Sequence, residues 1–302
     1  MQKDLVRDLA AAGLESRAVS ISHLDDLQYE YVTLKKDGIM SEAINGYISG
    51  FGMDLNAHPG MRTILVVASA ARIGQAIFNG QDGRLVTLIP PTYLEFGHEP
   101  KRMESQINQL LHPFGHSASL ADLPAKLLAA RSGLAKYGRN NVCYVKGFGS
   151  FVLLTTFVTD MPCEQDDWQP ASRMARCASC TACVDNCPTG AILIDRAVIN
   201  AGRCITLHNE AKSSIPFPAW IDPTSHNSLI GCLRCQSVCP VNRDALGRLA
   251  EPVEFDSQES EWIRTGKPVG TLPESTLAKV KALNMNNYYE PLSRNLQALL
   301  SQ

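Results

Sequence analysis

The stretch CASCTACVDNCP, residues 177 to 188, constrains this chain most, because it places four cysteines close together and ends in proline. Cys177, Cys180, Cys183 and Cys187 have the spacing C-x2-C-x2-C-x3-C-P. In bacterial ferredoxins this run binds 4Fe-4S clusters, and in two-cluster proteins the fourth cysteine ligates the other cluster. Each iron of a cubane takes one thiolate, so a tight loop can reach three corners. The run therefore predicts one cluster. If its fourth cysteine ligates another cluster, the chain must contain a second set of ligands.

The chain carries a second run that meets this need. Its spacing is C-x2-C-x3-C-P, from Cys232, Cys235 and Cys239, and Cys204 lies between the two runs. By the ligand exchange of two-cluster ferredoxins, the first set is predicted to be Cys177, Cys180, Cys183 and Cys239. The second set is predicted to be Cys187, Cys204, Cys232 and Cys235.

Two other uses of these cysteines are weaker. Disulfides are rare in the reducing compartment expected for this chain. Structural zinc sites usually separate their CxxC pairs by about a dozen residues or more, whereas here the third and fourth cysteines follow at once. The two cysteines outside both sets, Cys143 and Cys163, are interpreted as buried inert thiols.

Composition excludes several classes of protein. The chain has 302 residues, 45% of them hydrophobic, and a net charge of -2, which is unlike a non-specific nucleic-acid binder. No apolar run is long enough for a membrane helix. The amino-terminal residues resemble neither a secretory signal nor a twin-arginine leader, so a cytoplasmic protein is expected.

Hydrophobic patterning predicts a mixed α+β fold. Apolar runs bounded by turn residues predict strands at 63–70, 84–90, 141–145 and 151–160. Amphipathic patterns predict helices at 2–12, 101–111 and 123–135. A final helix is predicted to bury Leu292, Leu296, Leu299 and Leu300 on one face. We expect domains at 1–165 and 166–245, followed by a helical tail at 246–302.

One long segment resembles a known family. LLAARSGLAKYGRNNVCYVKGFGSFVLLTTFVTD (127–160) is similar to a segment of epoxyqueuosine reductases and reductive dehalogenases. CASCTACVDNCPTGAI, RCIT and GCLRCQSVCPVNRD resemble the ferredoxin region of epoxyqueuosine reductases, in the same order. The resemblance implies a nitroreductase-like domain, then a ferredoxin-like domain whose two clusters reduce a base-off cobalamin. It also implies a low-potential electron donor of the ferredoxin or flavodoxin type.

By position, the resemblance places five residues at the edge of the cobalamin: Gly138, Arg139, Asn140, Gly149 and Ser150. The alternative interpretation is that GRN and GFGS are turns that connect strands, since glycine suits positive φ.

The sequence departs from the family at the catalytic acid. An ungapped alignment places Ser119 where epoxyqueuosine reductases carry an aspartate, and Asp122 follows three residues later. Asp122 is also a candidate helix cap. Tyr93 and three histidines, His98, His112 and His116, are further candidate proton donors or ordinary structural residues.

Two functions remain open. The first is a corrinoid-dependent iron-sulfur reductase whose substrate is unidentified. The second is an electron-transfer protein or reductive activator that serves a corrinoid protein or a flavin protein, with the first domain as a docking surface.

Overall fold

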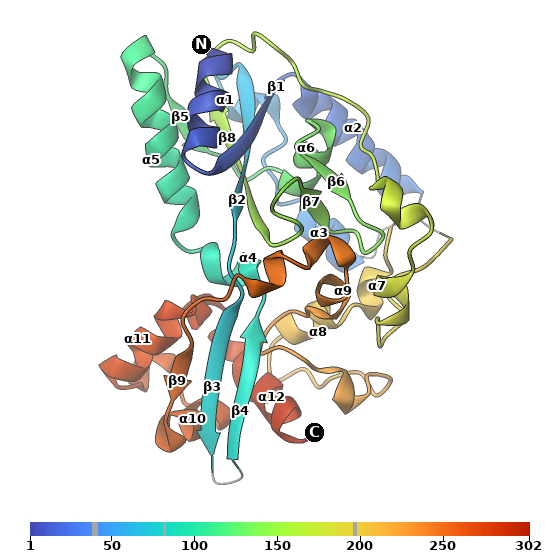
Figure 1. Ribbon diagram of the computed structural model, residues 1–302, viewed down its shortest axis with the longest axis vertical. Coiled ribbons are helices and arrows are strands. Elements are labelled where there is room, and N and C mark those ends of the chain that lie inside the picture. Colours follow the sequence, from blue (N-terminus) through green and yellow to red (C-terminus); the bar gives the residue numbers. More distant parts are fainter. Residues whose placement is uncertain (38–41, 81–82, 196–197) are drawn as a thin grey trace. The chain divides into compact units, whose positions relative to one another are not determined.

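The computed structural model describes residues 1–37, 42–80, 83–195 and 198–302 (Figure 1). The chain forms two compact units. Unit 1 comprises Met1–Ala70 and His98–Ser179, and unit 2 comprises Ala71–Gly97 and Cys180–Gln302. This grouping differs from the predicted division at 165 and 245, because residues 71–97 pack with the carboxyl-terminal part of the chain.

Unit 1 is built on an antiparallel sheet with the strand order β1-β2-β8-β5. Its strands are β1 (Leu14–Ser20), β2 (Thr63–Ala70), β5 (Ala118–Leu120) and β8 (Val152–Thr159). A separate hairpin pairs β6 (Ala135–Tyr137) with β7 (Cys143–Val145). The helices are α1 (Gln2–Ala11), α2 (His23–Lys36), α3 (Glu42–Ile48), α5 (Glu99–Leu111) and α6 (Ala125–Arg131).

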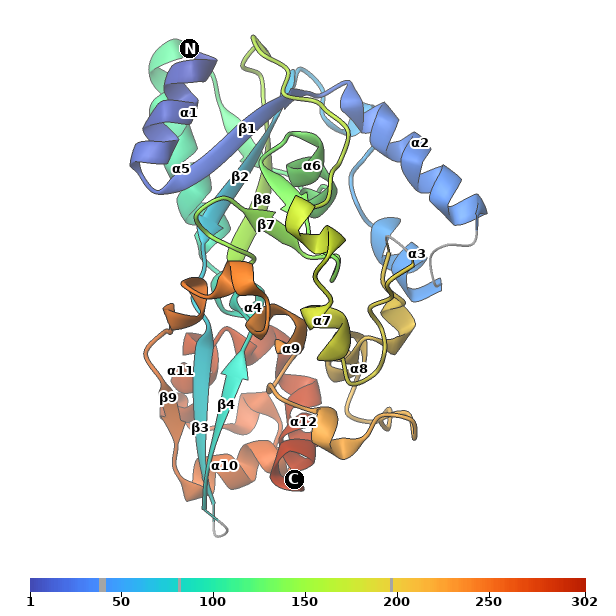
Figure 2. The same ribbon diagram turned by 45° about the vertical axis from the view of Figure 1, so that its right-hand side comes forward.

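Both faces of the unit 1 sheet are covered, which explains why β2 is almost continuously apolar. Leu65 and Val67 face a core that contains Leu9 of α1 and Met103 of α5. The alternate residues of β2 face a second core, to which α2 and α6 contribute. Figure 1 and Figure 2 show these helix pairs on opposite sides of the sheet.

Unit 2 contains a smaller sheet with the order β4-β3-β9. Its strands are β3 (Gly74–Gly80), β4 (Gly83–Ile89) and β9 (Val253–Phe255), and β9 runs parallel to β3. The helices are α4 (Pro91–Glu95), α7 (Ala182–Asp185), α8 (Ile205–Glu210), α9 (Arg234–Ser237), α10 (Ser257–Arg264), α11 (Glu274–Ala282) and α12 (Tyr289–Leu300).

The core of unit 2 joins segments that are far apart in the sequence. Phe78 of β3 stacks on Phe255 of β9, with ring centroids 5.0 Å apart. Helix α12 adds Leu292 and Leu296 to the same core. Leu299 is buried as predicted, but Leu300 is 48% exposed, so that part of the predicted stripe is wrong. The helix ends at Leu300, and the side chain of this last residue has no further turn to cover it.

The structure confirms the mixed class of helices and strands and most predicted elements. Residues 63–70 form β2, and the predicted strands at 84–90, 141–145 and 151–160 correspond to β4, β7 and β8. The predicted helices correspond to α1, α5 and α6. The nitroreductase-like description stays a prediction. No helix in the described part of the chain is both long enough and apolar enough to cross a membrane.

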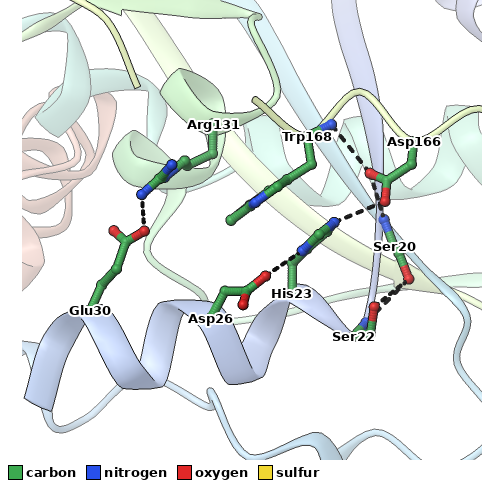
Figure 3. Close-up of polar contacts among 8 residues, drawn as sticks. All are labelled: Ser20, Ser22, His23, Asp26, Glu30, Arg131, Asp166 and Trp168. Carbon is green, nitrogen blue, oxygen red and sulfur yellow. Dashed lines mark hydrogen bonds and ion pairs between the residues drawn. The ribbon is translucent and has the colours of Figure 1, made fainter. Parts of the chain in front are cut away.

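A polar cluster in unit 1 ties α2 to the segment around residue 166 (Figure 3). His23 faces Asp26 through Nδ1 at 2.6 Å and Asp166 through Nε2 at 2.8 Å. Its ring stacks on Trp168, with centroids 4.1 Å apart and planes 7° from parallel. The guanidinium of Arg131 also lies over the Trp168 ring, 5.4 Å from its centroid. These contacts hold residues 166–168 against α2 and α6.

We expect His23→Ala to lower the free energy of unfolding by about 1–3 kcal/mol, because it removes the stacking on Trp168 and both carboxylate contacts. Urea unfolding of the full chain measures the loss. Tyr29→Ala is the matched control on the same helix, since Tyr29 is 74% exposed. A similar loss in both variants would contradict this role for His23.

Candidate iron-sulfur centre

Two short cysteine loops of unit 2 have the same local design. Helix α7 carries Cys183 and helix α9 carries Cys235, each within a single turn of helix. The side-chain amide of Asn186 donates to the backbone carbonyl of Arg234 over 2.8 Å and links the loops. None of the ten cysteines, all of which lie in the described part of the chain, forms a disulfide.

Cys232 of the predicted second set lies near two other members of that set, Cys204 and Cys187. Burial, the largest cause, and the nearby thiols of Cys204 and Cys187 together raise the pKa of Cys232 to about 11. A backbone hydrogen bond from Arg234 acts in the opposite direction. Like charges and low dielectric both disfavour a thiolate. A thiolate here therefore needs a cationic partner.

This donor set fits an iron-sulfur cluster. Thiolate ligands favour iron-sulfur clusters and soft metals, and the cationic irons supply the charge that buried thiolates lack. Among the described residues, no three His, Cys, Asp or Glu side chains converge as ligands of one metal ion. The thiolates of a cubane bind separate irons, so convergence on a single point is not required.

The two remaining cysteines lie in unit 1 and have other surroundings. Cys143 is 1% exposed, its thiol donates to the backbone carbonyl of Lys126, and burial raises its pKa to about 12. Burial also raises the pKa of Cys163 to about 11. Both thiols stay protonated at neutral pH. The prediction of a buried thiol holds for Cys143 but is wrong for Cys163, which is only part-buried.

Tyr93 lies beside the second set. Its hydroxyl donates to the carboxylate of Glu210, and its ring meets Tyr288 edge-on at 5.0 Å. Burial raises the pKa of Tyr93 above its usual range, and the charges of Glu210, Tyr288 and Cys204 add to this effect. Burial also raises the pKa of Glu210, although part of this residue faces solvent.

The backbone before Cys232 is held from several sides. Gly231 has a φ of +66°, and a Cβ atom there would lie 2.6 Å from the Tyr93 ring. Asn209 donates from its side chain to the carbonyl of Gly231 over 2.7 Å. Asn295 of α12 donates in turn to the carbonyl of Asn209 over 2.8 Å. These partners are distant in sequence, and no local motif predicts them.

The GRN and GFGS segments form turns in unit 1. The amide of Gly138 donates to Val142 over 2.8 Å, and Asn141 has a φ of +60°. A Cβ atom on Gly138 would lie 2.5 Å from both Asn140 and Tyr144. The turn interpretation therefore holds for GRN, and Gly149 likewise has a φ of +70°.

Arg139 and Asn140 are buried within that turn. The guanidinium of Arg139 donates to the backbone carbonyl of Cys177. The side-chain amide of Asn140 donates to the Tyr144 hydroxyl over 3.0 Å. Ser150 is 6% exposed. Contact of these residues with a cofactor stays a prediction.

The two candidate catalytic residues, Ser119 and Asp122, belong to unit 1, and both are exposed. Ser119 lies on β5 opposite Val158. Asp122 accepts a hydrogen bond at its backbone carbonyl from the Gly52 amide over 2.9 Å. The cap interpretation of Asp122 is wrong, because α6 begins at Ala125 with Pro124 at its N-cap and no capping side chain.

The three candidate histidines do not gather at one place. His98 and His112 are exposed in unit 1. His116 lies 3.5 Å from the Asp160 carboxylate. Tyr93, the fourth candidate proton donor, lies near a predicted cluster ligand, because the charge of Cys204 contributes to its raised pKa.

Residues 176–242 match the family described as a 4Fe-4S double cluster binding domain. An epoxyqueuosine reductase from Aliivibrio fischeri is 34% identical over 161 residues, which cover 53% of this chain and 40% of the relative. The Bacillus subtilis epoxyqueuosine reductase is 33% identical over 168 residues, covering 55% and 38%. This chain is similar to epoxyqueuosine reductases. The matched region spans about two fifths of these relatives.

Solved epoxyqueuosine reductases share the fold. The structure from Streptococcus thermophilus matches with a TM-score of 0.68 at 16% identity, covering 100% of this chain and 81% of that one. A structure from Bacillus subtilis gives 0.67 at 18% identity, with 99% and 81% covered. Another was solved with an epoxyqueuosine-modified tRNA stem loop, and gives 0.65 at 19% identity, with 99% and 80% covered.

We expect Cys235→Ala to lower the iron content from about eight atoms per chain to about four, because one cubane loses a ligand. Cys180→Ala should do the same for the first set. Iron analysis of anaerobically reconstituted protein measures the loss. Cys143→Ala is the control and should retain all the iron. Iron that stays near eight in the first two variants would refute the ligand sets.

We expect Gly231→Ala to lower the free energy of unfolding by about 1–3 kcal/mol more than Gly190→Ala, because only Gly231 has a ring in the space of the new methyl group. Both glycines have positive φ, +66° and +62°, and nothing lies within 4 Å at Gly190. Denaturant unfolding of both variants measures the difference. Equal losses would contradict the close approach of Tyr93.

Proposed function

We propose that this chain is an iron-sulfur reductase of the epoxyqueuosine reductase type, with two 4Fe-4S clusters, a corrinoid and an unidentified substrate. The observation that carries the proposal is the proximity of Cys187 and Cys204 to the part-buried thiol of Cys232 in unit 2. The double-cluster match and the similarity to epoxyqueuosine reductases support the same chemistry.

The two cysteine sets carry the clusters in this proposal. The second set takes Cys187 from the first run, as the ligand exchange of two-cluster ferredoxins requires. The influence of Cys187 on the pKa of Cys232 supports this assignment, since the two are 45 positions apart in sequence (232 minus 187). Small residues between the cysteines of the first run, such as Ala178 and Ala182, let backbone N–H groups approach the cluster sulfurs.

The clusters and the corrinoid, when bound, supply single electrons at low potential to a reducible substrate. The electrons would come from a ferredoxin- or flavodoxin-type donor. The chain itself positions the thiolates and shields them. Tyr93 closes over the backbone before Cys232, and Asn209 and Asn295 hold that backbone in place.

The corrinoid contacts are a finer part of the proposal. The side chains of Arg139 and Asn140 are used inside unit 1, and the side of Gly138 is filled by Tyr144. A corrinoid beside the GRN and GFGS turns would therefore be held by the GFGS turn, at Gly149 and Ser150. These groups would fix its position but would not take part in electron transfer.

The residue expected to donate a proton differs between this chain and epoxyqueuosine reductases. Ser119 stands at the position of their acid, and a serine hydroxyl does not protonate a substrate at neutral pH as a carboxylic acid can. Asp122 is the carboxylate nearest in sequence, and its side chain reaches solvent. This difference favours a substrate other than epoxyqueuosine. It also keeps the electron-transfer protein as the second candidate.

A cobalamin titration of the anaerobically reconstituted protein tests the proposal. We expect saturable binding and an EPR spectrum of base-off Co(II), because a protein site for the corrinoid displaces its lower base. Protein without clusters, and cobalamin alone, are the controls. An unchanged cobalamin spectrum in protein that contains about eight irons would refute the corrinoid reductase and favour the electron-transfer protein.

A further inference from the structure

Arg139 reaches from the GRN turn to the first cysteine of the first set. Residues 135–137 form β6, and the segment that leads to Cys177 runs beside them. The amide of Tyr137 donates to Ser172 and the amide of Met174 donates to Tyr137, each over 2.9 Å. The amide of Cys177 then donates to Met174 over 3.0 Å. The guanidinium of Arg139 completes this line of contacts at the carbonyl of Cys177.

The position of this arginine is unusual for a charged side chain. Arg139 is 7% exposed and Cys177 is 9% exposed. A guanidinium remains protonated at any physiological pH and carries several donors in a rigid plane. A buried positive charge is screened much less by solvent than an exposed one. It therefore acts on whatever charge its neighbour carries.

We propose that Arg139 is a positioning residue for the first cluster: it fixes the backbone of Cys177 and raises the reduction potential of the cluster that Cys177 ligates. A 4Fe-4S cluster with four thiolates becomes more negative on reduction. A fixed positive charge nearby stabilises the reduced form, and net charge and hydrogen bonds are known determinants of such potentials. The GRN turn thereby serves the cluster as well as the fold.

This inference rests on the proposed function only in its assignment of Cys177 to a cluster. It does not require a corrinoid or a substrate. Wild-type protein that takes up fewer than about eight irons would count against the proposed function. Wild-type protein with a full complement allows Arg139 to be judged separately.

The test compares Arg139→Gln with Arg176→Gln. Both remove one positive charge close to Cys177, but Arg176 is exposed and Arg139 is buried. Both proteins are reconstituted anaerobically, their iron is counted, and the clusters are titrated by EPR. Cys180→Ala, which retains only the second cluster, identifies the two signals.

We expect Arg139→Gln to keep its iron and to shift the first cluster to a more negative potential. At a fixed ambient potential its ratio of oxidised to reduced form should rise about tenfold, which is 59 mV for one electron. The second cluster should not shift, and Arg176→Gln should shift the first cluster less. Two unshifted clusters, or equal shifts in both variants, would overturn the proposal.

Arg139→Lys separates charge from geometry. Lysine keeps the positive charge but lacks the planar fork, so it should restore most of the potential. A lysine variant that shifts as far as the glutamine variant would overturn the role of the charge. If glutamine and lysine both lose only the first cluster, the hydrogen bond to Cys177 is indispensable, which supports positioning. Loss of both clusters together with the fold would make Arg139 merely structural and overturn the proposal.

Discussion

Repulsion between part-buried thiolates is the constraint on which unit 2 depends. Cys187, Cys204 and Cys232 come from three separate segments, and the charges of Cys204 and Cys187 oppose ionisation of Cys232. Burial adds to that opposition, because a low dielectric strengthens interactions between charges and removes their hydration. Such an arrangement is unfavourable as free thiolates and favourable around cationic irons. Folding and metal binding are therefore coupled at this site.

The scaffold that holds these cysteines comes from both ends of unit 2. Tyr93 follows the β3-β4 hairpin and packs against Gly231, directly before Cys232. Asn295 lies on the last helix and acts through Asn209 on the same backbone. The hairpin pairs with β9 and shares a core with α12. The short cysteine motif is thus packed between the segment of Tyr93 and the last helix, which are more than one hundred residues apart in sequence. Burial of this kind raises the pKa of Cys232.

The sequence predicts the local features of this molecule well and the long-range ones poorly. Strand β2 is an almost continuous apolar run, so its position follows directly from the sequence. The spacing of the cysteine runs likewise predicts that they bind iron-sulfur clusters. By contrast, β3 has glycine at both ends and a mixed interior, and its pairing with β9 joins residues separated by about 175 positions, as in the partners Ala76 and Val253. Nothing local in either strand specifies that partner.

The same limit explains the GRN turn. Its glycine suggests a turn, which the hydrogen bond from the Asn141 amide to the Gly138 carbonyl confirms. The link from Arg139 to Cys177 crosses 38 positions of sequence, so no spacing rule reveals it. Similarly, Asp122 could cap a helix only if that helix started at residue 123, directly after it. The helix instead starts at Ala125, and Pro124 occupies the N-cap. Here the sequence pattern typical of a helix cap does not coincide with the first residue of the helix.

The surroundings of the candidate acids narrow the chemistry further. A reduction that adds electrons to a neutral substrate needs a donor that gives up its proton at the working pH. Tyr93 is a poor donor, because burial and its negative neighbours hold the phenolic proton more tightly. Its hydrogen bond to Glu210 and its contact with Gly231 instead make it part of the wall around the second set. Asp122 of unit 1, by contrast, is exposed, and its backbone carbonyl accepts a hydrogen bond from the Gly52 amide.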